Sequence, residues 1–205
     1  MELLTYLSKA VDQALQLKIS EDRKKVLQGL ITYLNDKIDS SKIINLNFIC
    51  THNSRRSQFS QIWAKVAAHS YGIPINSYSG GVEVTEFNPR AVASMKRLGF
   101  QIDKEGQDNP LYTVKFADHG SLECYSKLYN DPVNPQEDFA AIMTCAHADQ
   151  NCPIVSGAEV RLPVRYEDPK LFDGTPLEAE KYDELSLQIA SEMFYVFCLV
   201  KHRTS

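Results

Sequence analysis

Cys50 and Arg56 are the residues of this chain whose types and spacing best support chemistry: a thiol and a guanidinium separated by five residues, with Ser57 directly after. A mostly apolar run, residues 43–49, precedes the cysteine and predicts a buried strand. An amphipathic pattern at helical spacing resumes after the serine. Residues 51–56 are therefore predicted to form a loop from the carboxyl end of a strand to the N-terminus of a helix.

Such a loop suits a tetrahedral oxyanion, because its backbone N–H groups and the helix N-terminus supply converging donors. Arg56 would hold two oxygens bidentately. The same surroundings, with a hydrogen bond from Ser57, would favour the thiolate of Cys50 as a nucleophile. The simpler alternative is a buried cysteine beside two solvated arginines. The predicted substrate-binding residues are Thr51, His52, Asn53, Ser54, Arg55, Arg56 and Ser57.

A second apolar run, residues 139–144, ends at a cysteine in the same way, at Cys145. In a parallel sheet both cysteines would emerge at the carboxyl edge, where open α/β folds bind ligands. Cys152 follows seven positions later in a polar segment, helical or unwound, whose loosening would let two thiols meet; the alternative is coincidence. This spacing is not a common zinc pattern and His147 stands alone, so we expect no metal site.

Composition describes an ordinary globular protein. The 205 residues are enough for one domain with an ample core, and 43% are hydrophobic. A net charge of −4 gives no sign of the basic surface that a nucleic-acid-binding protein needs. No apolar run approaches the roughly 20 residues of a membrane span, and charges interrupt the first 17 residues where a signal peptide needs an apolar core. We therefore expect a cytoplasmic protein without membrane or nucleic-acid partners, whose five cysteines serve redox chemistry or burial.

Two amphipathic helices are predicted at the start of the chain, over residues 3–17 and 21–38, with Ser20 as the N-cap of the second. They suggest a helical hairpin over residues 1–40, ahead of a catalytic region at 41–205. The hairpin would pack on the core or make a homodimer contact; a partner or substrate role is the alternative.

The rest of the chain alternates strands and helices. Short strands are expected within residues 72–81 and 160–164, and helices beginning at Asn88-Pro89 and spanning residues 177–200. Residues 104–138 are rich in turns, with a strand-like stretch at 111–116, and would line a substrate cleft or cover a sheet edge. Cys124, within this stretch, is expected to be structural.

These motifs together resemble the low-molecular-weight tyrosine phosphatase superfamily and, within it, the thioredoxin-coupled arsenate reductases. The resemblance covers residues 43–201 apart from an insertion at 104–138. Its motifs are the Cys50 loop, the Asn88-Pro89 helix start, the pair Cys145 and Cys152 followed by proline, and Asp168-Pro169. It implies an α/β fold with a four-stranded parallel sheet sandwiched by helices, to which the N-terminal hairpin is added.

The resemblance also implies an arsenate reductase without a cofactor. Cys50 would attack arsenate, and Asp168 would act as the general acid. Cys145 would then attack Cys50 and expel arsenite, and Cys152 would move the disulfide outward to a thioredoxin-like reductant. One alternative is a tyrosine phosphatase that acts on a phosphate ester through a phosphocysteine. A second is a non-catalytic redox or oxyanion sensor.

Three positions depart from the family pattern. His52 replaces a glycine, which would narrow the loop, and Arg55 replaces a cysteine, which would favour a bulkier or more anionic substrate. Gln61 stands where some relatives have a glutamate that helps hold potassium, so a bound cation is not expected.

Overall fold

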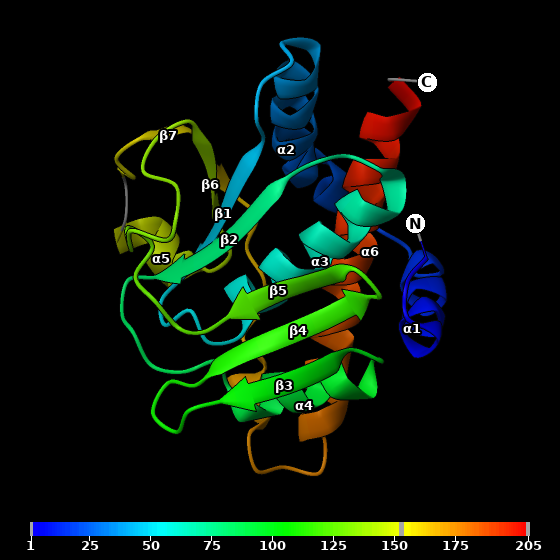
Figure 1. Cartoon of the computed structure of the whole chain (residues 1–205), viewed down its shortest axis with the longest axis vertical. Helices are drawn as coiled ribbons and strands as arrows, with labels where there is room; N and C mark the ends of the chain where they lie inside the picture. Colours follow the sequence, from blue (N-terminus) through cyan, green and yellow to red (C-terminus); the bar gives the residue numbers. More distant parts are fainter. Residues whose placement is uncertain (1, 152–153, 204–205) are drawn as a thin grey trace.

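The computed structural model describes residues 2–151 and 154–203. Four strands, β1 (Asn45–Cys50), β2 (Asn76–Gly81), β6 (Phe139–Met143) and β7 (Ala158–Pro163), form a parallel sheet in the order β2-β1-β6-β7. This is the predicted four-stranded parallel sheet, flanked by helices (Figure 1). The helices are α1 (Thr5–Leu15), α2 (Glu21–Asp39), α3 (Arg56–Tyr71), α4 (Pro89–Arg97), α5 (Ala146–Asn151), the 3-10 helix η1 (Pro169–Phe172) and α6 (Glu178–Arg203).

The central strands are buried on both faces, which explains their nearly continuous apolar sequences. Because successive side chains of a strand point to opposite faces, they divide between two clusters. Phe48 and Ile142 join the main core with the large helices. Ile49 and Met143 join a smaller cluster that also contains Cys50, Cys145, Ala148 of α5 and Tyr129.

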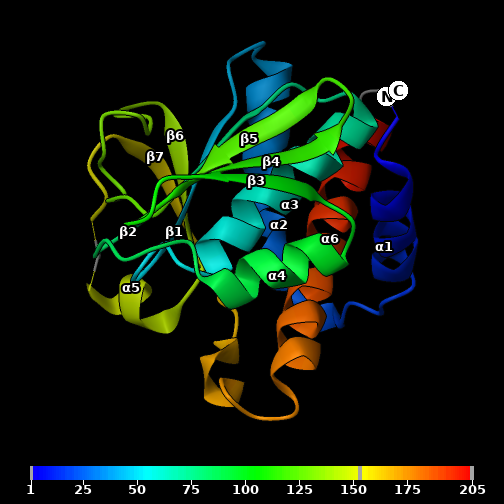
Figure 2. The same cartoon turned by 60° about the horizontal axis from the view of Figure 1, so that its bottom comes forward.

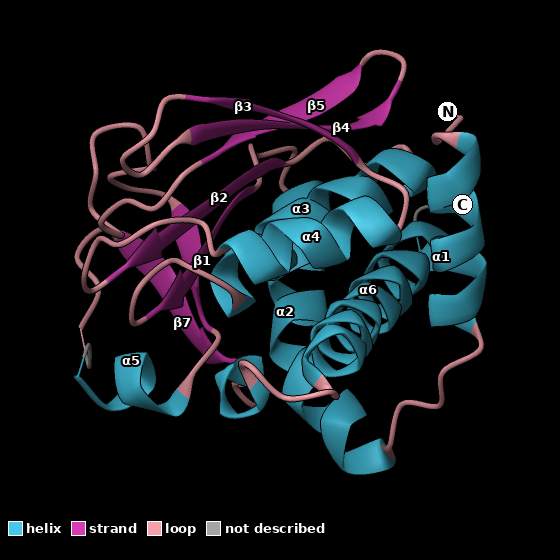
Figure 3. Cartoon of the chain, turned by 90° about the horizontal axis from the view of Figure 1, so that it is seen from below, coloured by secondary structure: helices cyan, strands magenta, loops and turns pink. Residues whose placement is uncertain are grey.

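The long helix α6 lies at the centre of the helical layer. Helices α1, α2, α3 and α4 all pack against it, as seen from below in Figure 3. The two predicted N-terminal helices are therefore part of the main core, to which α1 contributes Leu7 and α2 contributes Leu27 and Leu30, all fully buried. The predicted caps are confirmed as well: Ser20 accepts from the Arg23 amide, and Asn88 accepts from the Arg90 amide ahead of α4.

A second, antiparallel sheet lies over α3 and α4 (Figure 2). It consists of β3 (Gln101–Glu105), β4 (Leu111–Ala117) and β5 (Gly120–Cys124). The sequence predicts only its middle strand, β4, because β3 and β5 are short and owe their extension to pairing with β4. Cys124 is fully buried in the main core, where burial raises the pKa of its thiol to about 12, as suits a structural residue.

None of the helices within the described ranges is both long enough and apolar enough to cross a lipid bilayer.

Candidate active site

Cys50 lies at the end of β1 with its sulfur 3.1 Å from the Ser57 hydroxyl oxygen, on the first turn of α3. Asn53 donates from its side-chain nitrogen to the same hydroxyl oxygen over 2.9 Å. Because Ser57 accepts from Asn53, its own hydrogen can point at the sulfur. All three side chains are buried, so little water competes for these bonds, and the arrangement can aim a hydroxyl donor at the Cys50 sulfur.

The loop backbone is available to an anion. The N–H groups of residues 52–55 donate to no protein acceptor in the described part of the chain. Asn53 has a positive φ of 46°, a conformation that asparagine tolerates better than most residues. Gly81, at the end of β2, packs directly on the loop, and a Cβ there would lie 2.7 Å from the Asn53 nitrogen. Glycine at position 81 therefore allows β2 to approach the loop this closely.

The segment after the second sheet holds this loop from outside. The Lys127 amide donates to Asn53 Oδ1 over 3.0 Å, which fixes the orientation of the Asn53 amide. The Ser126 hydroxyl donates to the His52 carbonyl over 2.8 Å. Asn109 in turn bonds both the N–H and the C=O of Ser126. Sequence reasoning missed these residues; the turn-rich composition around Asn109-Pro110 was their only signal.

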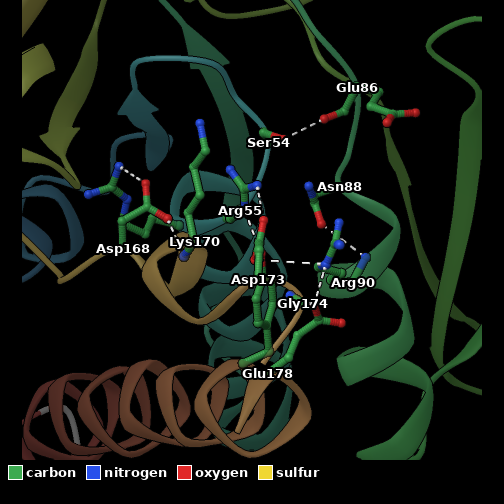
Figure 4. Close-up of polar contacts among 12 residues, drawn as sticks. Ser54, Arg55, Glu86, Asn88, Arg90, Asp168, Lys170, Asp173, Gly174 and Glu178 are labelled. Carbon is green, nitrogen blue, oxygen red and sulfur yellow. Dashed lines mark hydrogen bonds and ion pairs between the residues drawn. The ribbon is translucent and has the colours of Figure 1, made fainter. Parts of the chain in front are cut away.

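Arg56 and Asp168 come together across 112 residues of sequence. The guanidinium donates to Asp168 Oδ2 over 2.7 Å and to the Tyr166 carbonyl over 3.1 Å. Asp168 also caps η1 by accepting from the Lys170 amide, as Figure 4 shows. The predicted acid and the predicted oxyanion clamp therefore face each other at the loop. An incoming oxyanion would compete with Asp168 for Arg56.

Tyr166 anchors the chain just before Asp168. Its hydroxyl donates to Glu192 of α6 over 2.8 Å, and its amide donates to the Thr144 carbonyl. Burial and the Glu192 carboxylate raise the pKa of Tyr166 well above its usual range, so the hydroxyl stays neutral and remains a donor.

Arg55 is turned toward the η1 segment. It donates to the Tyr182 hydroxyl over 2.7 Å and pairs with Asp173 at 3.4 Å, while Arg90 approaches the same carboxylate (Figure 4). Burial and the bond to Asp173 raise the pKa of Tyr182 to about 12. The structure thus places the Arg55 charge in a contact that fastens the segment after Asp168. The expected preference for a bulkier or more anionic substrate stays a prediction.

The remaining loop side chains have structural contacts. Ser54 donates to the Glu86 carbonyl over 2.8 Å, as Figure 4 shows, and half-exposed His52 lies 3.4 Å from the Glu83 carboxylate. The side chains of Ser54 and His52 thus support the loop from its edge. Substrate contact at these positions, proposed from the sequence, would therefore come from the backbone N–H groups.

Cys145 lies beside the loop because β1 and β6 are neighbours. The Thr144 amide donates to the Ile49 carbonyl over 2.7 Å, and the Thr51 hydroxyl lies 3.5 Å from the Cys145 sulfur. Cys50 and Cys145 share one buried cluster. The segment beyond begins with the short helix α5, and the predicted third cysteine, Cys152, lies outside the described residues.

No group of three His, Cys, Asp or Glu side chains that could hold a metal ion occurs among the described residues. Gln61 is buried, and its side-chain oxygen has no hydrogen-bond partner in the described part of the protein. As a neutral amide it brings no negative charge to a cation.

The fold and the loop define a class of protein, the low-molecular-weight phosphatase fold. A low-molecular-weight phosphotyrosine phosphatase from Vibrio cholerae O395 has a similar structure, with a TM-score of 0.52 at 14% identity over 79% of this chain and 97% of its own. At that identity the likeness concerns the fold alone. No family model matches the chain.

Two relatives identify the family more closely. Arsenate reductase 1 of Staphylococcus saprophyticus is 30% identical over 142 residues, which are 69% of this chain and 90% of the relative. Arsenate reductase 2 of Staphylococcus epidermidis is 31% identical over 122 residues, or 60% of this chain and 76% of the relative. The chain belongs to the arsenate reductase family of the low-molecular-weight phosphatase superfamily.

Proposed function

We propose that this protein reduces arsenate to arsenite with its own cysteines and returns to the reduced state through a thioredoxin-like dithiol. One observation carries the proposal: Cys50 ends β1, Cys145 follows the end of the adjacent parallel strand β6, and the Cys145 sulfur contacts Thr51, the residue directly after Cys50. Phosphate-ester hydrolysis needs only the first cysteine. The names of the two staphylococcal relatives support the reductase as well.

The first step uses the loop. Arsenate would bind to the N–H groups of residues 52–55 and displace the Asp168 carboxylate from the Arg56 guanidinium. The Cys50 thiolate, supported by Ser57, would attack arsenic, while Asp168 protonates the departing oxygen, which leaves as water. This step alone would also cleave a phosphate ester.

Reduction occurs in the second step. The sulfur of Cys145 would form a bond to the sulfur of Cys50, and the Cys50 sulfur–arsenic bond would break with its electron pair left on arsenic. Arsenic(V) thereby becomes arsenic(III), and the two thiols become a disulfide. Cys152 would then attack Cys145 and release Cys50, so that the external dithiol meets a Cys145–Cys152 disulfide.

The test compares two activities of one preparation. Cys145→Ser and Cys152→Ser should each stop arsenite production with a thioredoxin system, since reduction needs both thiols. Aryl phosphate hydrolysis, if the parent has it, should persist, because Cys50, Arg56 and Asp168 remain. Peptide mapping after arsenate and alkylation should find a Cys50–Cys145 disulfide in the Cys152→Ser protein. Arsenate cycling at the parental rate in both variants would contradict the relay and favour the phosphatase.

A further inference from the structure

The Thr51 hydroxyl stands between two groups, the Cys145 sulfur and the imidazole of His147. Its oxygen lies 3.5 Å from the sulfur and 3.2 Å from Nδ1 of the ring. Cys145 is only 1% exposed and Thr51 8%, whereas His147 lies at the surface on α5. The three groups thus form a chain of contacts from the buried thiol to solvent. The proposed steps of arsenate reduction assign no role to His147, at the solvent end of this chain.

Cys145 needs an acceptor for its proton before its sulfur can attack. A thiol attacks as the thiolate, and a free thiol is only a few per cent ionised at pH 7. The apolar side chains of Ile49, Met143 and Ala148, in the same buried cluster, offer no acceptor for that proton. Among the described residues, its other polar contact is the Ala148 amide, which donates to the sulfur over 3.3 Å. That N–H stabilises a thiolate but cannot accept a proton.

Thr51 can pass the proton on because a hydroxyl both donates and accepts. If its oxygen accepts from the Cys145 thiol, its hydrogen points to Nδ1 of His147. An imidazole with Nδ1 unprotonated is an acceptor there, and it is the side chain best suited to take a proton near neutral pH. The reverse order would need the thiol sulfur, a weak acceptor, to compete with a ring nitrogen.

We propose that His147, acting through Thr51, takes the proton of Cys145 during the second step; this inference rests on the proposed arsenate reduction. The Cys145 proton moves to the Thr51 oxygen while the Thr51 proton moves to Nδ1. The freed electron pair of the Cys145 sulfur forms the bond to Cys50, and the sulfur–arsenic pair remains on arsenic. His147 then releases the proton to water.

The experiment reads Cys145 directly, in a Cys50→Ser background, through its alkylation rate. His147→Gln keeps the shape and an acceptor for Thr51 but takes no proton as Cys145 reacts, so the rate should fall about 10- to 30-fold. His147→Glu carries a base of similar size and should recover part of the loss. A purely structural His147 would give the same result with Gln and Glu.

Thr51 supplies the matched test of the relay. Thr51→Val should lower Cys145 alkylation as much as His147→Gln, Thr51→Ser should preserve it, and the double variant should be no worse than either single one. His119→Ala, at an exposed turn far along the chain, is the control and should change nothing. Parental alkylation in both His147→Gln and Thr51→Val would overturn the relay.

A separate measurement with Cys50 present shows whether the protein makes arsenite at all. If the parent makes none while Cys145 alkylation still depends on His147, the proposed function fails and the relay stands. If the parent makes arsenite and the Cys50–Cys145 disulfide forms equally fast with His147→Gln, the relay fails and the proposed function stands.

Discussion

The strands β1 and β6 lie side by side and each leads to a cysteine, yet the protein holds the two ends differently. After β1, the loop is fixed by side-chain bonds from three directions: Asn53 to Lys127, His52 to Ser126, and Arg55 to Tyr182. After β6, Cys145 is followed by a six-residue helix in which Asp149 pairs with Arg161 of β7 and with Arg165.

This difference matches the tasks proposed for the two ends. A loop that stabilises an oxyanion must have its donors in place before the reaction. A segment that must bring one thiol to another and then present a disulfide outside gains from fewer tertiary contacts, since such regions open at low free-energy cost. Substitutions in the loop after β1 should therefore affect both arsenate reduction and phosphate-ester hydrolysis. Substitutions in the segment after β6 should affect arsenate reduction only.

The largest effect is expected at Asn53. Asn53→Ala places alanine at a positive φ and leaves the Lys127 amide without its acceptor, which together should cost about 3 kcal/mol, or about 100-fold in activity. Arsenate reduction and aryl phosphate hydrolysis should fall together in kcat/KM. Asn53→Gly relieves the backbone strain and should lose only about tenfold. Parental rates in both proteins would mean that the loop needs no such support.

A smaller effect on both activities is expected at Ser126. Ser126→Ala removes the donor to the His52 carbonyl and the acceptor of the Thr85 amide, worth about 1 kcal/mol, or about fivefold in kcat/KM. Ser121→Ala, at an exposed position of the preceding strand β5, is the control. If the two alanine variants have equal rates, the segment after the second sheet does not position the loop.

The smallest effect is expected at Asp149, and it separates the segment after β6 from the loop after β1. Asp149→Asn preserves the shape of this buried side chain and removes the charge that binds two partly exposed arginines, a change of about 1 kcal/mol. Arsenate turnover should slow about threefold to fivefold, because without this charge α5 holds His147 less firmly beside Thr51. Aryl phosphate hydrolysis should be unaltered; an equal loss there would show that the two strand ends act as one unit.

Much of the architecture was open to prediction because it depends on local pattern. The apolar runs before Cys50 and Cys145 are buried strands, and the Ser20 and Asn88 caps occur where expected. The antiparallel sheet was missed except for β4, since short strands with mixed composition become strands only by pairing. The predicted site residues are also partly assembled: Arg56 meets Asp168, and Cys145 lies beside Thr51.

The sequence by itself determined which residues are candidates for the chemistry and at which edge of the sheet they emerge, because strand period and helix starts are properties of neighbouring residues. Only the tertiary structure decided how those residues are held. Lys127, 74 positions from Asn53, sets the orientation of its amide, and Tyr182, 127 positions from Arg55, draws that arginine away from the loop. A hydrogen bond between distant segments depends on how the layers stack, and no local pattern encodes that distance or direction.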